Sequence, residues 1–176
     1  MVLPIDVFWF SVPIKAGAFW SNNLEPSELG ASFGLVQLDK FKNFTKLRNR
    51  NFEIHRTFFK KLNNFFIVPK ISKNVKTNFL AYPIILKSNL NFSRKDLQIY
   101  LEKNNIQTRT IFTGNILKQP IVKNRKYKKL KNSEKNSNDV MKNGILIGCH
   151  QGMRIEEINY IFKTFNKFLN KLVKPV

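Results

Sequence analysis

The sequence predicts a two-layer α+β domain in which amphipathic helices pack against short strands. Apolar residues recur with a helical period over residues 44–65, whereas residues 79–86 and 145–149 are short apolar runs typical of strands. Turn residues, mostly Gly and Asn, separate these segments. The chain has 176 residues, of which 43% are hydrophobic. This length and composition suit one domain with a real core, or half of a larger enzyme.

The first part of the chain is a lead-in segment followed by helix. Residues 1–20 are rich in Phe, Trp and Pro without a clear period, and residues 8–14 suit an edge strand. Ser27 suits an N-cap, after which the pattern becomes helical. Apolar residues lie on two sides of this helix, with Leu29, Phe33 and Val36 on one and Leu35 and Leu38 on the other. We therefore expect partners on both sides.

The rest of the chain alternates strands and helices. Ser93 and Asp96 form a capping-box pattern at the start of a helix that Asn104 and Asn105 end. The other predicted elements are a strand at 79–86, a strand at 108–112, a turn at 114–115, a polar loop at 118–135, a strand at 145–149 and a helix from Arg154. The chain then divides into a lead-in segment (1–20), a long helical segment (21–66) and an α+β domain (67–176) with a basic loop at 118–137.

The chain is strongly basic, with a formal net charge of +20. Such a charge is typical of nucleic-acid-binding proteins, and the densest basic run is Lys126, Lys128, Lys129 and Lys131. However, Lys, Asn, Ile and Phe are enriched together, as the codons of an AT-rich genome would cause. Most Phe residues also lie at core spacing rather than among the basic residues. We therefore favour a solvated loop over a nucleic-acid surface.

Few residues suggest metal or thiol chemistry. One Cys and two His cannot supply the roughly four ligands of a structural zinc site, and the single thiol suggests a reducing, cytoplasmic setting. No apolar run reaches the roughly 18 residues of a membrane span. Cys149 and His150 are neighbours on a predicted strand, so their side chains should face opposite sides and not form a thiolate–imidazole pair. Glu156 and Glu157 suit the positive end of a helix dipole rather than an acid–base pair.

Arg109 and His150 are the candidates for ligand binding. Arg109 lies on a short strand beside the Gly114-Asn115 turn, where its guanidinium can grip an anionic or polyhydroxyl ligand with two hydrogen bonds. His150 lies between a buried strand and a turn bounded by Gly152. Two interpretations of His150 stay open: it faces a ligand at the strand end, or it is a hydrogen-bonded edge residue.

Several short motifs follow one another in a fixed order. They are Asn23-Leu24, Pro26 to Leu29, Ala31 to Leu38, Gln107 to Arg109, Ile111 to Ile116, Gln119-Pro120, Asn138 to Met141, Ile147 to His150 and Gly152-Met153. Together they resemble the DegT/DnrJ/StrS family of nucleotide-sugar aminotransferases, and most of all its branch of CDP-4-keto-6-deoxyglucose 3-dehydrases. An ordered set spanning about residues 22–169 is far more specific than a single short pattern.

The resemblance implies the C-terminal small domain of a fold-type I enzyme, with a short antiparallel sheet and helices packed on one face. The complete enzyme would be a homodimer that uses pyridoxal or pyridoxamine phosphate on a nucleotide-linked keto sugar, in deoxysugar or lipopolysaccharide (O-antigen) biosynthesis. The large domain, which holds the catalytic residue in the family, has no counterpart here. We therefore expect no catalysis by this chain alone, and residues 21–66 to pack on a large domain supplied elsewhere.

The resemblance also assigns residues to the cofactor and the sugar. Asn23 falls where an Asn of the family reaches the cofactor phosphate of the partner subunit, although Ser21-Asn22 replaces the Gly-Tyr that precedes it in the family. The residues placed at the sugar pocket are Arg109, Gly114, Asn115 and His150. Guanidinium, amide and imidazole groups are donors that the oxygens of a keto sugar require. Two alternatives stay open, a basic nucleic-acid-binding module and a decayed gene fragment with no function.

Overall fold

The computed structural model describes residues 27–128 and 134–173, so Asn23 and the strand suggested at residues 8–14 lie outside the described residues. The elements are α3 (Glu28–Lys61), β1 (Phe66–Ile67), β2 (Ala81–Leu86), α4 (Arg94–Lys103), β3 (Thr108–Thr110), the 3₁₀ helices η1 (Ile116–Lys118) and η2 (Pro120–Val122), α5 (Lys135–Asn143), β4 (Gly144–Gly148) and α6 (Ile155–Val173). The chain divides into two compact units, residues 1–41 and 42–176. All elements after the middle of α3 belong to the second unit.

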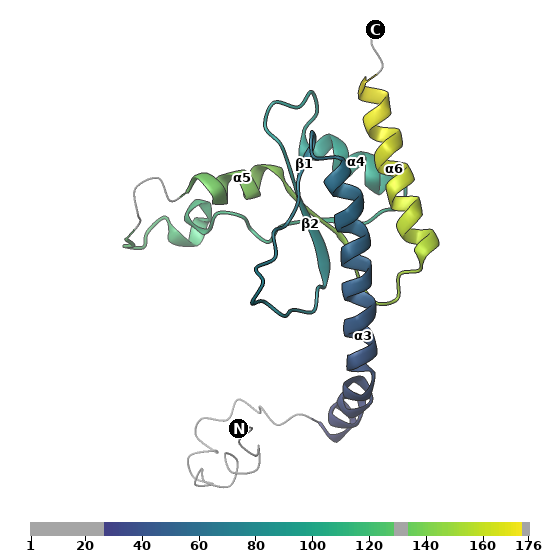
Figure 1. The fold of residues 1–176 in the computed structure, drawn as a ribbon. Coiled ribbons are helices and arrows are strands. Elements are labelled where there is room, and N and C mark those ends of the chain that lie inside the picture. The colour runs from purple at the N-terminus through teal and green to yellow at the C-terminus, as the bar shows by residue number, and fades with distance from the viewer. Residues whose placement is uncertain (1–26, 129–133, 174–176) are drawn as a thin grey trace. The chain divides into compact units, whose positions relative to one another are not determined.

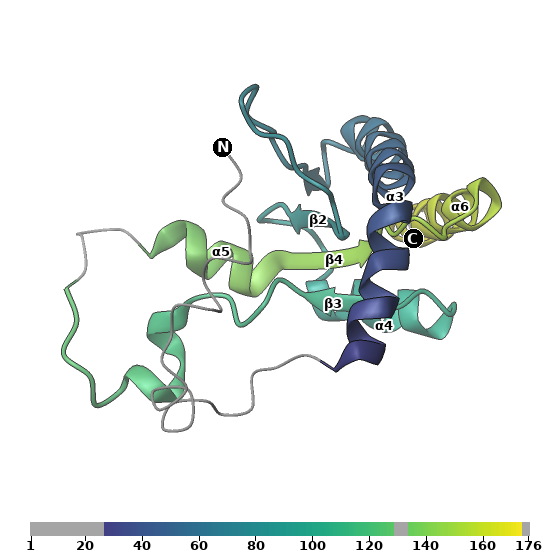
Figure 2. The same ribbon diagram turned by 90° about the horizontal axis from the view of Figure 1, so that it is seen from below.

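The second unit is built on a four-stranded antiparallel sheet with strand order β1-β2-β4-β3. The central strand β4 pairs with β2 on one side, where Pro83 is opposite Leu146, and with β3 on the other, where Arg109 is opposite Leu146. Figure 2 shows β2, β4 and β3 next to one another, with α5 leading directly into β4. The register places Pro83, Leu146 and Arg109 in one row on the same face of the sheet.

The opposite face of the sheet forms the hydrophobic core with three helices. Side chains of β2 are alternately buried and half-buried, with Tyr82, Ile84 and Leu86 on the buried side. The residues that meet them from α3, α4 and α6 include Phe52, Phe59, Leu97, Leu101, Ile158 and Phe165. Figure 1 shows α6 alongside the second half of α3, on one side of the strands. The predicted α+β class, with an antiparallel sheet and helices on one face, is confirmed.

Local signals place the helix ends. Ser93 Oγ accepts a hydrogen bond from the Asp96 backbone N–H at 3.2 Å, and Asp96 Oδ2 accepts one from the Ser93 backbone N–H at 2.8 Å, which confirms the capping box. These hydrogen bonds from Ser93 lower the pKa of the Asp96 carboxyl. Asn105 has the left-handed φ of 58° that often ends a helix, and Ser27 Oγ accepts from the Gly30 backbone N–H at the start of α3.

The structure differs from the predicted elements at three places. The strand expected at 108–112 ends at Thr110, because Phe112 has a left-handed φ of 46° that no strand accepts. Helix α5 begins at Lys135, within the stretch expected as a loop, and β1 was not predicted. Neither shows a periodic apolar pattern, since α5 is short and mostly polar and β1 is two residues long.

The part of α3 that belongs to the first unit exposes an apolar surface. Leu29 is 83% exposed and Phe33 67%. The other exposed apolar residues of this stretch are Leu35, Val36, Leu38 and Phe41. Large apolar side chains gathered this way mark a surface that other groups usually cover. We name residues 29–41 the apolar segment of α3.

One buried histidine makes the core sensitive to pH. The His55 side chain has no exposed area, and Nε2 lies 3.1 Å from the Gly148 carbonyl oxygen, so the neutral ring donates this hydrogen bond. The ring also lies against Phe59, Tyr82 and Phe162. Burial lowers the pKa of His55 to about 4, because a charged imidazole would lose its hydration there.

We predict that the free energy of unfolding falls as the pH drops from about 6.5 to about 4. The unfolded chain binds the His55 proton near its ordinary pKa of 6.5, whereas the folded chain resists it down to about pH 4. The stabilisation is complete above pH 6.5 and decreases by up to about 3 kcal/mol on acidification to pH 4. Urea unfolding at several pH values measures this slope. A His55→Phe variant should lose this part of the slope, and an unchanged slope would contradict the prediction.

Candidate functional site

A cavity of about 650 Å³ lies in the second unit, at the edge of the sheet. Its walls come from the end of β4, the first turns of α6, the connection between α4 and β3, and β3 itself. The polar residues that line it include Asn105, Gln107, Arg109, His150, Glu156, Glu157 and Tyr160. Leu80, Leu146 and Ile161 are among its apolar lining residues. A partly apolar cavity with a few convergent polar groups is the usual form of a small-molecule site.

The sheet and α4 place Arg109 in the cavity wall. Thr108 donates two hydrogen bonds to Glu102 Oε1 on α4, at 2.6 Å from its backbone N–H and 2.8 Å from its hydroxyl. This contact fixes the start of β3, so the next residue, Arg109, faces the side opposite the core. Its exposed guanidinium makes no hydrogen bond or ion pair with another described residue. All of its donors are therefore free for a ligand.

His150 follows the end of β4 and offers one defined donor to the cavity. The Gly152 backbone N–H donates to His150 Nδ1 at 3.1 Å, so Nδ1 is the unprotonated nitrogen of the neutral ring. The proton of the ring is then on Nε2, which becomes a hydrogen-bond donor. The structure shows the hydrogen-bonded edge position of His150 and also places the residue in the cavity lining, so the ligand-facing interpretation stays a prediction.

Cys149 is buried on the other side of the chain from His150. Its side chain has no exposed area, and Sγ donates to the Arg48 carbonyl oxygen at 3.8 Å. Burial raises the pKa of the thiol to about 12. A protonated, buried thiol is not a nucleophile, so the structure supports the expectation that Cys149 and His150 form no catalytic pair.

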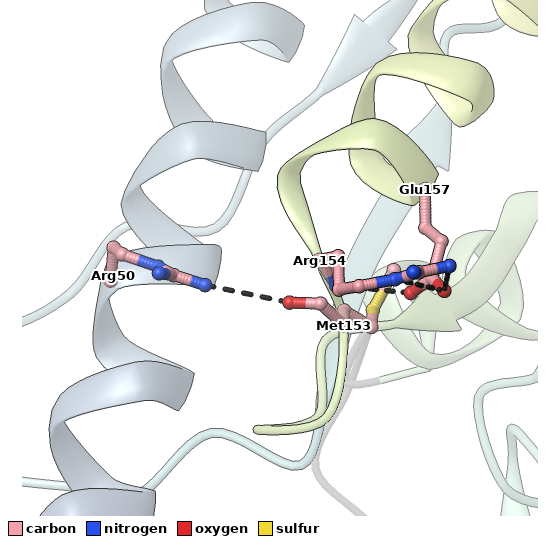
Figure 3. A network of polar contacts seen from close by, with 4 residues as sticks. All are labelled: Arg50, Met153, Arg154 and Glu157. Carbon is pink, nitrogen blue, oxygen red and sulfur yellow. Dashed lines mark hydrogen bonds and ion pairs between the residues drawn. The ribbon is translucent and has the colours of Figure 1, made fainter.

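The first turn of α6 forms the acidic part of the wall. Glu157 accepts from the Arg154 backbone N–H at 3.0 Å and from its guanidinium at 3.1 Å, which lowers the pKa of the Glu157 carboxyl. Figure 3 shows this pair beside Met153. Tyr160, one turn further on, donates its hydroxyl to the Asn104 carbonyl oxygen at 3.0 Å and so ties α6 to the end of α4. The cavity lining therefore combines the Arg109 guanidinium with carboxylate acceptors.

Gly114 and Asn115 do not line this cavity. Asn115 is buried, and its Nδ2 donates to Glu134 Oε2 at 3.0 Å and to Asn138 Oδ1 at 2.9 Å. Gly114 has a left-handed φ of 71°, and a Cβ there would collide with Met141 on α5. In this structure both residues hold the segment after β3 against α5. Of the residues that were assigned by resemblance and that lie within 27–128 and 134–173, the structure thus brings only Arg109 and His150 together at the cavity.

Other cavity residues were not foreseen from the sequence. Tyr160 lines the wall without belonging to a pattern that marks a site, and Gln107 was part of a motif but was not singled out as a ligand residue. Glu156 was attributed to the helix dipole alone, yet it also lines the cavity. A face of α6 that is polar at Glu156 and Tyr160, one turn apart, was the available signal. It became informative only once the opposite wall, from β3, was known.

A small antiparallel sheet, helices on one face and a partly apolar cavity at its edge define an α+β domain with a candidate ligand site. The model of the DegT/DnrJ/EryC1/StrS aminotransferase family matches residues 13–166. The chain therefore belongs to this family, as its motifs suggested.

Individual relatives agree with this assignment. The lipopolysaccharide biosynthesis protein RfbH of Salmonella typhimurium is 27% identical over 146 residues, covering 83% of this chain and 33% of that protein. The structure of the E. coli GDP-4-keto-6-deoxy-D-mannose-3-dehydratase with bound hydrated PLP has a TM-score of 0.67 and 27% identity, covering 80% of this chain and 35% of that one. An aminotransferase from Psychrobacter cryohalolentis has a TM-score of 0.74 at 14% identity, covering 85% of this chain and 40% of that chain, and supports the fold alone.

The chain spans about a third of the length of the curated relatives it matches. Pyridoxal phosphate is a cofactor of solved family members, as the E. coli dehydratase shows. Within residues 27–128 and 134–173, no helix is both long and apolar enough to cross a membrane.

We predict that Asn115 contributes to stability, unlike Arg109. Asn115→Ala removes the partner of Asn138 and of the Leu117 backbone N–H, which bonds to Asn115 Oδ1 at 2.9 Å. Leaving these half-buried groups without their partner should lower the free energy of unfolding by about 1 kcal/mol. The exposed Arg109→Gln should change it by less than about 0.5 kcal/mol. Denaturant titrations compare the two, and equal stabilities would contradict this division of roles.

Proposed function

We propose that this chain is the C-terminal part of a nucleotide-sugar enzyme that depends on pyridoxal or pyridoxamine phosphate, a 3-dehydrase or aminotransferase of deoxysugar or lipopolysaccharide (O-antigen) biosynthesis. The observation that carries the proposal is the cavity where Arg109 and His150 both present free donors, in a chain of this family. The E. coli relative is a dehydratase of a GDP-linked keto sugar by name. The chain would bind the sugar and would not catalyse the reaction without the rest of the enzyme.

The donors and acceptors of the cavity fit a sugar. A guanidinium and an imidazole N–H suit carbonyl and hydroxyl oxygens, while Glu156 and the amide oxygen of Gln107 accept from hydroxyl groups. The apolar lining of Leu146 and Ile161 suits the less polar face of a deoxysugar ring. Each of these lining groups therefore has a matching hydroxyl, carbonyl or apolar group on a deoxysugar.

The cofactor does not fit this cavity. Its phosphate carries about two negative charges and needs several donors, whereas Glu156 and Glu157 place carboxylates in the wall. When bound, the cofactor supplies the electron sink of the reaction. We therefore assign its binding to the remaining part of the enzyme, and to Asn23 of a partner subunit in a homodimer, as the resemblance implies. This chain would orient the sugar from the side opposite the cofactor.

The apolar segment of α3 would dock on that remaining part, consistent with the expected packing of residues 21–66. Its exposed Leu29, Phe33 and Leu38 supply the contact surface. The relatives are about three times as long as the matched region, so each contains the additional chain that such a surface needs.

The two alternative functions, a basic RNA-binding module and a decayed fragment, predict different ligand binding. A basic RNA-binding module would use the positive charge, and exposed Tyr127 among Lys123, Arg125, Lys126 and Lys128 favours it. Against it, the family's relatives carry names of sugar-modifying proteins. A decayed fragment with no function would keep the fold and bind neither ligand. We also propose a cytoplasmic location for such an enzyme, because the single thiol suggests a reducing setting.

Titration of the chain with GDP-mannose, followed by NMR, tests the sugar proposal. We expect shifts at Arg109, His150 and Tyr160, and an increase in Kd of at least about tenfold in Arg109→Gln, because charge-assisted hydrogen bonds are lost. Arg56→Gln is the matched control, since Arg56 pairs with Glu53 on α3 at 2.6 Å. Binding of oligo(U) RNA that survives moderate salt, without sugar-specific shifts, would favour the basic module instead.

The docking surface has its own test. The isolated chain should bind an apolar fluorescent dye and self-associate, because the apolar segment of α3 is uncovered. Phe33→Ser together with Leu38→Ser should reduce both effects, whereas Ile121→Ser, at a residue that is 71% exposed elsewhere, should not. A monomer that binds no dye would contradict the docking proposal.

A further inference from the structure

We infer that Asn51, in the buried part of α3, is a positioning residue that holds the imidazole of His150 in the cavity wall. The inference concerns the cavity of the proposed function and rests on that function only for the identity of the ligand. The contacts that support it all lie within the second unit. They lead from α3 to the backbone after β4, and from that backbone to the ring.

Asn51 is fully buried and uses both ends of its amide. Nδ2 donates to the His150 carbonyl oxygen at 2.8 Å. Oδ1 accepts from Arg50 at 3.1 Å from Nε and 2.9 Å from Nη2. The same Arg50 reaches the Met153 carbonyl oxygen at 3.4 Å (Figure 3). The Arg50 contacts orient the Asn51 amide, so that its NH₂ group and not its oxygen faces His150.

Neighbouring residues of α3 hold the rest of the segment 148–153. His55 Nε2 is 3.1 Å from the Gly148 carbonyl oxygen, and Arg48 Nε donates to Gln151 Oε1 at 2.7 Å. Positions 48, 51 and 55 are spaced by three and four residues, which places them on one face of the helix. Asn51 occupies the middle of this row and contacts His150 itself.

The position of the backbone decides the position of the ring. The His150 carbonyl oxygen also accepts from the Met153 backbone N–H at 3.3 Å, which closes a tight turn. In this turn the Gly152 N–H points at His150 Nδ1, 3.1 Å away. A Cβ on Gly152 would lie 3.2 Å from Nδ1 and 3.3 Å from Cε1, a tight contact that the ring would relieve by shifting a few tenths of an ångström. The turn that Asn51 supports thus sets both the orientation and the tautomer of His150.

NMR of the ring nitrogens tests the inference without a ligand. The chain has two histidines, so ¹⁵N spectra of the imidazoles contain two sets of signals, assigned with His150→Gln. In the unaltered chain we expect His150 Nδ1 unprotonated and Nε2 protonated. Asn51→Asp keeps the acceptor for Arg50 but points an oxygen at the His150 carbonyl. We expect the ratio of the Nε2–H to the Nδ1–H tautomer to fall about tenfold, as for the loss of one hydrogen bond.

Two further variants keep the test decisive. Gly152→Ala should change the same signals by displacing the ring directly. Phe165→Leu is the control for lost stability, because it removes core volume at a ring that stacks edge-on against Phe59 and Phe66, and it should leave His150 unchanged. If Asn51→Asp does not fold, Arg50→Gln at the exposed neighbour loosens the same amide and should shift the tautomer ratio in the same direction.

Ring signals that stay unchanged in a folded Asn51→Asp variant, or in Arg50→Gln where Asn51→Asp does not fold, would overturn the inference. An equal change in Phe165→Leu would overturn it as well, because the effect would then follow stability. Failure of GDP-mannose to bind a chain with the expected His150 signals would refute the proposed function and leave this inference intact.

Discussion

The end of strand β4 is the constraint on which the rest of the structure depends. Backbone pairing with β2 stops at Gly148, so the carbonyl groups that follow have no strand partner. Backbone groups without partners are costly, and side chains of α3 supply hydrogen bonds to the carbonyl oxygens of Gly148, His150 and Met153. The same helix contributes Phe52 and Phe59 to the core. One element therefore fixes both the scaffold and the segment that forms the cavity wall.

One face of the sheet forms the hydrophobic core, and the other face carries the functional groups. The helix-covered face is filled with aromatic rings such as Phe59, Tyr82 and Phe165, which leave little room for movement. Functional groups are placed at the edge and on the other face, where Arg109 extends beside Leu146. A cavity built on a packed sheet and two helix ends holds its donors at fixed positions, which lowers the entropic cost of binding a flexible ligand.

The sequence revealed local order well and long-range contacts poorly. The apolar run at 79–86, most of which forms β2, and the capping box at Ser93 depend on neighbours within a few residues, so they could be predicted. Asn51 and His55 find their partners 99 and 93 residues away, and no local pattern marks them. Helix α5 was missed because it is short, mostly polar and has no buried residue. Arg109 could be singled out, because a lone Arg on a short strand differs from a Lys-rich background.

The segment after β3 shows that a motif is not the same as a set of ligand contacts. Gly114 and Asn115 belong to the motif that suggested the sugar pocket, yet they contact α5 rather than the cavity. Their effect on Arg109 is indirect, since holding this segment against α5 fixes where the chain goes when β3 ends at Thr110. The position of a ligand-binding side chain thus depends on neighbouring residues that do not contact the ligand. In the same way, Asn51 positions His150 through a hydrogen bond to its carbonyl oxygen.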